Sequence, residues 1–194
     1  VYRASSISEY QEAAKESIKA VTGIEVESGR RGGRLGSRAG DSSFWGTGLT
    51  HTGAGSGRPS DLRDPYCNAS GGGWWWHTPY ATMDHGDVDI LEETVKVQLN
   101  YIFRIINSIV IPMNYVPLAG AILEILETLQ EKADKVKAYF NLYPVIDRAR
   151  EFKELAEKLE ETVKKAVGKK APGDVLEELN HCLMWIGRYI HPVG

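Results

Sequence analysis

The sequence has few cysteines, no excess of positive charge and no uninterrupted apolar run of membrane-spanning length. Cys67 and Cys182 are its two cysteines, which are too few for a disulfide framework and lack the spacing of a zinc knuckle. The net charge of -3 gives no general attraction to nucleic acid or to an anionic membrane. We therefore expect no nucleic-acid partner. Two cysteines suit a cytoplasmic protein and leave secretion open.

One stretch without a charged side chain runs from Ile105 to Leu123 and is about as long as a spanning helix. Pro112 and Pro117 interrupt it, and a proline inside a helix costs roughly 3 kcal/mol. The sequence therefore predicts a helix end, a turn and the start of a second helix here, with no membrane span.

Several motifs of catalytic or ligand-binding sites are also missing. No Gly-x-Ser-x-Gly elbow is present, and the segment from Gly53 to Gly57 matches neither a P-loop nor a dinucleotide fingerprint. The segment from Arg30 to Arg38 is basic and rich in glycine, but it lacks the interleaved aromatic residues of an RNA-binding tract. A carboxylate-binding or solvated loop fits it better.

Helical periodicity dominates both ends of the sequence. An apolar stripe from Ser6 to Val21 predicts a helix, and Ile24 to Val26 is a short strand candidate. Most of the glycines lie between residues 29 and 73, where we expect loops with a helical turn at 41–47 and a strand at 49–52. Asp87 is placed to cap a helix that reaches about Val110.

After Pro117 the pattern is wholly helical. The three segments 118–140, 145–167 and 174–190 each carry an apolar stripe at a spacing of about 3.6 residues, with charged residues on the opposite face. Such helices are typical of a bundle or of a dimer face. The change in character predicts two domains, at residues 1–115 and 116–194.

The most informative segment is Trp74-Trp75-Trp76-His77, which is followed by Asp84. Three exposed tryptophans are costly unless they line a pocket or pack under a loop. Neutral histidine is a common zinc ligand, and apolar rings with carboxylates close by suit such a site. An aromatic cluster beneath a loop, with a hydrogen-bonded histidine at its rim, is the alternative interpretation.

The order of three motifs resembles a known family. The segment Ala39 to Leu49, which contains Asp41, resembles its acidic segment; Trp76-His77-Thr78 with Asp84 resembles its last metal-ligand motif; and Asn107 to Pro112 resembles the end of its catalytic domain. The family is the di-zinc exopeptidases, which include bacterial aminopeptidases, glutamate carboxypeptidases and transferrin-receptor-like proteins. The similarity covers roughly residues 5 to 115, and larger members continue into a helical dimerisation domain.

This resemblance implies an α/β fold, in which the C-terminal portion of a mixed-sheet exopeptidase domain precedes an all-α dimerisation domain. It implies two zinc ions that activate a water molecule and a glutamate that acts as general base on a peptide substrate. His77 matches a metal ligand. Asp41 and Asp84 match supporting positions around the ligands, and Trp74, Trp75 and Trp76 would wall the substrate pocket.

The sequence departs from the family in its metal ligands. Nothing before Asp41 matches the expected His, Asp, Glu-Glu and Asp series, and Ala81 replaces an acidic residue four positions after His77. A catalytic zinc needs about three protein ligands, so we expect no catalytic residue and no activity in this chain alone. The missing ligands, with Val1 in place of an initiator Met, predict the C-terminal part of a longer aminopeptidase that dimerises through its C-terminal helices.

Two alternatives stay open at this point. The first is a non-catalytic interaction module, comparable to the receptor branch of the family. The second is a helical adaptor whose Trp-rich loop is unrelated to zinc. Neither the cleaved residue nor the role of the segment from Arg30 to Arg38 follows from the sequence.

Overall fold

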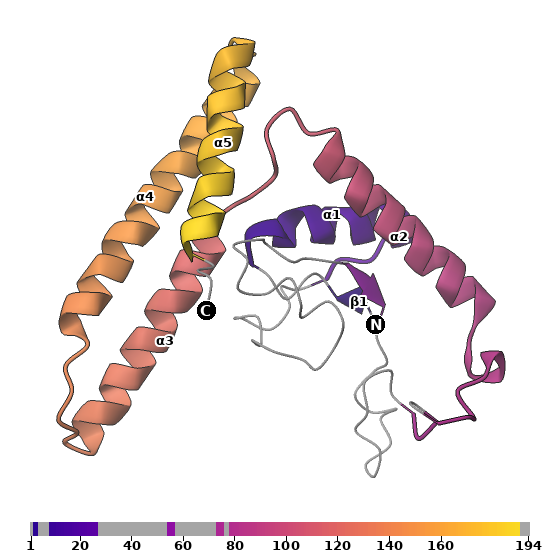
Figure 1. Cartoon of the computed structure of the whole chain (residues 1–194), viewed down its shortest axis with the longest axis horizontal. Coiled ribbons are helices and arrows are strands. Elements are labelled where there is room, and N and C mark those ends of the chain that lie inside the picture. Colours follow the sequence, from indigo (N-terminus) through magenta and orange to yellow (C-terminus); the bar gives the residue numbers. More distant parts are fainter. Residues whose placement is uncertain (1, 4–7, 27–53, 57–72, 76–77, 191–194) are drawn as a thin grey trace.

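A computed structural model describes residues 2–3, 8–26, 54–56, 73–75 and 78–190, and these residues are mainly helical (Figure 1). The α-helices are α1 (Gln11–Thr22), α2 (Val88–Ile106), α3 (Val116–Lys135), α4 (Tyr143–Gly168) and α5 (Gly173–Ile190). Two 3-10 helices, η1 (Ser8–Tyr10) and η4 (Met83–His85), and two strands, β1 (Tyr2–Arg3) and β2 (Gly55–Ser56), complete the described elements.

The expected α/β mixed-sheet fold is wrong for the part of the chain that the structure describes. Strands β1 and β2 pair antiparallel over two residues each, with Tyr2 opposite Ser56, whereas ordinary strands run to about five or six residues. The strand candidate from Ile24 to Val26 is not a strand, because it is short and Ile24 is 48% exposed. The helical turn expected at 41–47 and the strand expected at 49–52 lie outside the described residues.

Helix α1 confirms the helix that the sequence predicts between Ser6 and Val21, although it begins later, at Gln11. The predicted stripe is buried at Tyr10, the last residue of η1, and at Ala14 and Ile18 of α1, as the spacing predicts. Gly23 ends the helix in a left-handed conformation (φ 72°) and donates its N–H to the Lys19 carbonyl at 2.9 Å. A residue with a Cβ adopts this conformation at a cost, which is why glycine favours the position.

Helix α2 begins where its cap predicts. The Asp87 carboxylate accepts hydrogen bonds from the N–H groups of Asp89 and Ile90 at 2.9 and 3.1 Å. These bonds satisfy donors that otherwise lack a partner at a helix start. The helix packs on α1 with Val97 and Tyr101 buried.

The uncharged stretch from Ile105 to Leu123 is divided between two helices, as its prolines predict. Helix α2 ends at Ile106, and α3 begins at Val116 with Pro117 in its first turn. Proline is tolerated there because the first helical N–H groups have no partner within the helix. Within the described residues, no helix is long and apolar enough to cross a membrane.

The three C-terminal helices lie along one another and form one arm of the molecule (Figure 1). The first of them, α3, was expected to end at Phe140 but ends at Lys135. It stops there because Lys137 adopts a left-handed conformation (φ 51°). The buried Gln130 side chain then fixes the turn: its oxygen accepts from the Leu142 N–H at 2.5 Å and its amide donates to Asp134 at 2.7 Å.

One buried cluster connects the two ends of the chain. It includes Tyr10 and Ile18 from the N-terminal segment together with Tyr115 and Leu183. The Tyr115 hydroxyl donates to the Leu183 carbonyl at 2.6 Å. The cluster therefore crosses the expected boundary between residues 115 and 116, and the division into two domains stays a prediction.

Candidate functional site

The structure places three of the six candidate site residues, namely Trp74, Trp75 and Asp84. The other three, His77, Trp76 and Asp41, lie outside the described residues. The expected metal ligand therefore has no described position, whereas several residues close to it in the sequence do.

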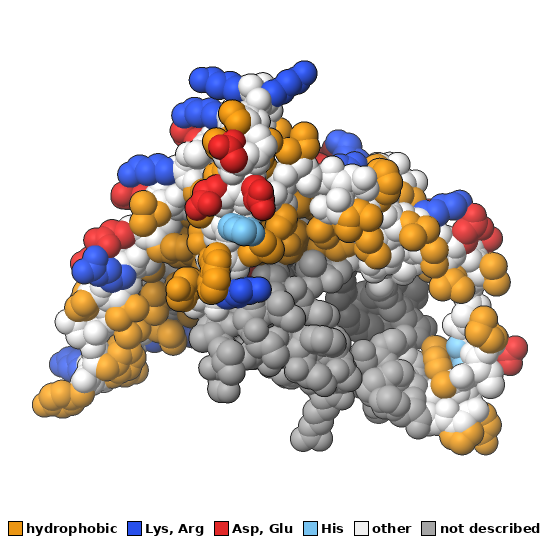
Figure 2. All heavy atoms as spheres, turned by 45° about the horizontal axis from the view of Figure 1, so that its top comes forward, with side chains coloured by type: hydrophobic (Ala, Val, Ile, Leu, Met, Phe, Trp, Pro, Cys, Tyr) orange, Lys and Arg blue, Asp and Glu red, His pale blue; other side chains and the backbone are white. Residues whose placement is uncertain are grey.

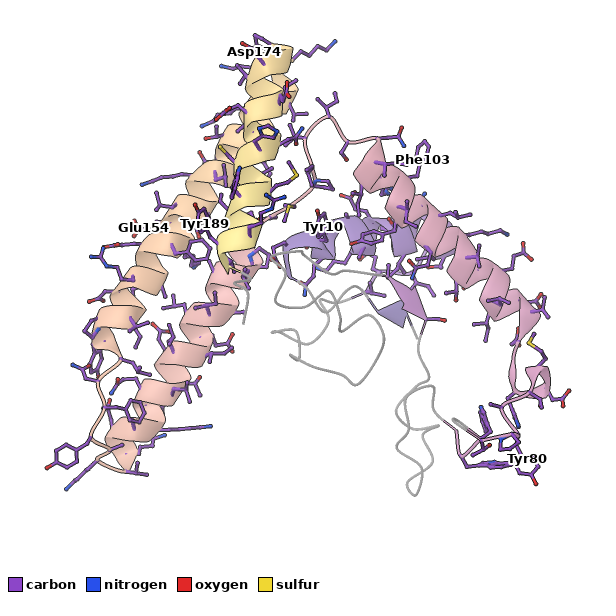
Figure 3. All side chains as sticks on the ribbon, in the orientation of Figure 1. Tyr10, Tyr80, Phe103, Glu154, Asp174 and Tyr189 are labelled. Atoms are coloured by element: carbon purple, nitrogen blue, oxygen red, sulfur yellow. The ribbon has the colours of Figure 1, made fainter. Side chains whose placement is uncertain are left out.

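Four rings form an aromatic cluster, which consists of Trp74, Trp75, Tyr80 and His85. The Trp75 and His85 rings stack with centroids 4.0 Å apart and an angle of 5° between their planes. The Trp74 ring lies edge-on to both, at 6.1 Å from each, and 5.5 Å from the Tyr80 ring. Stacked and edge-to-face pairs are the arrangements that aromatic rings prefer. Figure 3 shows Tyr80 beyond the N-terminal end of α2, away from the other helices.

The backbone around the cluster is held by a tight turn. The Thr78 hydroxyl and N–H both donate to the Trp75 carbonyl, at 2.7 and 3.0 Å. The Tyr80 N–H donates to the Thr78 hydroxyl at 3.2 Å. The Trp75 ring covers buried Gly73 so closely that a Cβ there would collide with it. Local bonds therefore fix Trp75 in position.

Asp84 is exposed and lies in η4, where it accepts a hydrogen bond from the Thr82 hydroxyl at 3.1 Å. Its neighbour His85 turns toward the tryptophans and was not among the expected site residues. Its proximity in sequence to Asp84 was a signal, but only the folded turn brings it onto Trp75. The supporting role expected for Asp84 around a metal stays a prediction.

The described residues do not form a zinc site by themselves. Among them, no three His, Cys, Asp or Glu side chains come close enough to hold a metal ion together.

The aromatic cluster is open to solvent, and acidic residues follow it in the sequence. Trp74 is 51% and Tyr80 64% exposed, and the segment from Gly73 to Val95 contains five acidic residues and no lysine or arginine: Asp84, Asp87, Asp89, Glu92 and Glu93. Exposed indole and phenol faces attract cations and apolar groups. This arrangement suits contact with an apolar or positively charged group.

The buried polar residues near the N-terminus have a structural role. Burial raises the pKa of Tyr10 to about 12, with the nearby Tyr101 and Glu9 adding to the rise. Burial also raises the pKa of Tyr115 above its usual range, with Glu9 adding to the rise. The Glu9 carbonyl accepts from the Asn114 N–H at 2.8 Å. These groups join η1 to the chain segment before α3.

Comparisons of the chain with protein-family models, curated proteins and solved structures find no match. The resemblance to zinc exopeptidases therefore rests on the motifs in the sequence alone.

Proposed function

We propose that this chain is one part of a zinc-dependent exopeptidase, most similar to an aminopeptidase, and that it contributes His77, an aromatic pocket wall and dimerising helices. The observation that carries the proposal is the aromatic cluster. Trp74 and Trp75 lie directly before the His77 motif and are held in fixed ring contacts with Tyr80 and His85. Ligand pockets are lined mainly by apolar and aromatic side chains, and histidine is a common zinc ligand.

By itself the chain is inactive in this proposal. His77 is the one residue that matches a metal ligand of the family, and a catalytic zinc needs about three protein ligands with one open position. The chain's part in the reaction is to hold one side of the metal and to line the substrate pocket. Further ligands and the general base come from sequence that this chain does not supply.

Zinc content tests the incomplete site. After exhaustive dialysis of the purified chain, we expect no near-stoichiometric zinc and no release of an amino acid from peptide substrates with zinc added. A His77→Ala variant should behave identically, with His181→Ala as a control at an exposed histidine on α5. Retained zinc that is lost in His77→Ala and kept in His181→Ala would mean that the chain builds its own site.

The coding sequence upstream of Val1 tests the enzymatic part of the proposal. A histidine, a bridging aspartate and a Glu-Glu pair in the family's order would support an exopeptidase. Their absence would overturn it in favour of the second candidate below.

We further propose that the C-terminal helices form a homodimer. On α5, Trp185 and Tyr189 are 51% and 79% exposed, with ring centroids 6.1 Å apart. Arg188 lies over the Trp185 ring at 5.0 Å. Tryptophan, tyrosine and arginine are the residues that dominate binding energy at protein interfaces. Figure 3 shows Tyr189 on the arm formed by α3, α4 and α5.

The second candidate function is a non-catalytic interaction module. The exposed apolar side chains of α2 and α5 favour it, because surfaces of this kind mark sites of protein association. Both candidates include the dimerising helices. They differ in whether His77 binds zinc together with further ligands.

A further inference from the structure

Helix α2 is apolar on two faces, of which one is covered and the other exposed. Val97 and Tyr101 are buried on the side that packs on α1. A second set of apolar residues recurs every three or four positions on another side and is between 47% and 72% exposed: Val88, Leu91, Val95, Leu99, Ile102 and Ile106. We call this set the α2 stripe. Figure 2 shows hydrophobic side chains gathered along the arm that α2 forms.

The stripe is large for a surface that faces water. At about 100 Å² of apolar surface per half-exposed side chain, its six residues present on the order of 600 Å². One partner's share of a standard protein interface is about 800 Å², with a lower limit near 600 Å². The largest apolar patch on a typical monomer is about 300–600 Å². The stripe is therefore large enough to support a stable dimer.

The stripe suits a second copy of the same helix. It is aliphatic, without a charged residue, and four of its positions are arranged symmetrically about a point between Gln98 and Leu99: Leu91 and Ile106 lie equally far from this centre, as do Val95 and Ile102. A two-fold axis through this centre would pair each residue with its counterpart in the other copy.

Charge decides the relative direction of the two helices. The N-terminal half of α2 carries Asp89, Glu92 and Glu93 with Lys96, whereas the C-terminal half carries Arg104 as its charged residue. A parallel pair would place the acidic halves beside each other. Arg104 is already ion-paired with Glu16 of α1 at 2.7 Å, so the acidic residues decide the direction: an antiparallel pair keeps the two acidic halves apart and aligns the helix dipoles favourably.

We propose that two copies of this chain associate through their α2 stripes as an antiparallel helix pair with its two-fold axis near Leu99. This surface is separate from the α5 face with Trp185, and it does not rest on the zinc proposal. If both surfaces are used, the assembly is a tetramer with two kinds of isologous interface.

Disulfide crosslinking tests the geometry directly. In a chain with Cys67→Ser and Cys182→Ser, Leu99→Cys should crosslink two copies on mild oxidation, because the axis brings its Cβ atoms together. Leu91→Cys alone should not, since its two copies lie more than about 20 Å apart along the pair. The double variant Leu91→Cys with Ile106→Cys should crosslink again. Crosslinking of Leu91→Cys alone would indicate a parallel pair, and no crosslinking in any variant would overturn the proposal.

Sedimentation equilibrium tests the energetics. Leu99→Glu should weaken association through α2 by about 100-fold or more and halve the assembly's mass, because it buries two unpaired carboxylates at the axis. Lys158→Glu, at an exposed position of α4, is the control and should change the dissociation constant by less than about tenfold. A monomeric wild type, or an unchanged mass for Leu99→Glu, would overturn the proposal. Helix content by circular dichroism shows whether each variant is folded. If Leu99→Glu does not fold, the crosslinking of the cysteine variants decides whether two copies pair through α2.

Discussion

At the scale of single residues, the candidate site depends on short-range contacts. The turn from Gly73 to Tyr80 is closed by Thr78, and the Trp75 ring lies between Gly73 and His85. The sequence located this segment through its run of tryptophans. It did not identify His85 as their partner, because ring stacking depends on the path of the turn and on η4.

Gly73 gives a prediction at this scale. Gly73→Ala should displace Trp75 from His85, because the added Cβ collides with the indole ring. We expect a changed near-ultraviolet circular dichroism spectrum with little change in the free energy of unfolding, since neither tryptophan belongs to the main buried cluster. Gly120→Ala in α3, where a Cβ meets nothing within 4 Å, should leave that spectrum intact and stabilise the chain by up to about 1 kcal/mol. An unchanged spectrum for Gly73→Ala would contradict the packing described.

At the scale of elements, the helices follow their local signals closely. Asp87 caps α2, Gly23 ends α1 and Pro117 lies in the first turn of α3, as expected. The sheet did not follow, because a strand has no internal hydrogen bonds and needs partners from elsewhere in the chain. In the described residues β1 and β2 are the strands found, and they are held by the contact of Ala54 and Ser56 with Gln98 and Thr94 of α2.

The proposed α5 dimer gives a prediction at this scale. Trp185→Glu should weaken dimerisation through α5 by about 30-fold or more, because an exposed interface tryptophan is lost and a carboxylate is buried. Val175→Glu is the matched control: Val175 is exposed at the other end of α5, where a helix start tolerates a carboxylate. Light scattering across a dilution series gives the dimer dissociation constant of each variant. Equal constants for Trp185→Glu and the wild type would exclude this face as the interface.

At the scale of the whole molecule, a few hydrogen bonds join the segment between α2 and α3 to the last helix. The Tyr115 hydroxyl reaches α5 through the Leu183 carbonyl. Asn180 of α5 donates to the Ile109 carbonyl at 3.0 Å and accepts from the Ile111 N–H at 2.8 Å. The segment between α2 and α3 is therefore held by hydrogen bonds to α5, which connects the arm formed by α2 with the arm formed by α3, α4 and α5.

Buried tyrosines make this connection sensitive to alkali. Because the pKa of Tyr10 is about 12 in the folded chain and about 10 in an unfolded one, the unfolded state loses its proton first as the pH rises. Stability is therefore unaffected below about pH 10 and falls as the pH rises through about 12. Tyr115, whose pKa is also raised by burial, acts in the same direction.

Tyr115→Phe separates this effect from the hydrogen bond. At pH 7 it should lower the free energy of unfolding by about 1 kcal/mol, because the bond to Leu183 is lost. Between pH 10 and 12 its stability should fall less steeply than that of the wild type. Urea unfolding at pH 7 and at several alkaline pH values measures both. Parallel curves for the two proteins would show that Tyr115 does not titrate with unfolding.

The sequence by itself determined where the helices form, because caps, prolines and 3.6-residue stripes act through bonds within a few residues. It also located the aromatic segment of the candidate site. The tertiary structure decided which apolar face of α2 is covered: Val97 and Tyr101 are buried against α1, and Leu99 and Ile102 are exposed. Both faces are apolar, so periodicity cannot choose between them. Burial depends on which element packs alongside, and that is a property of the folded chain.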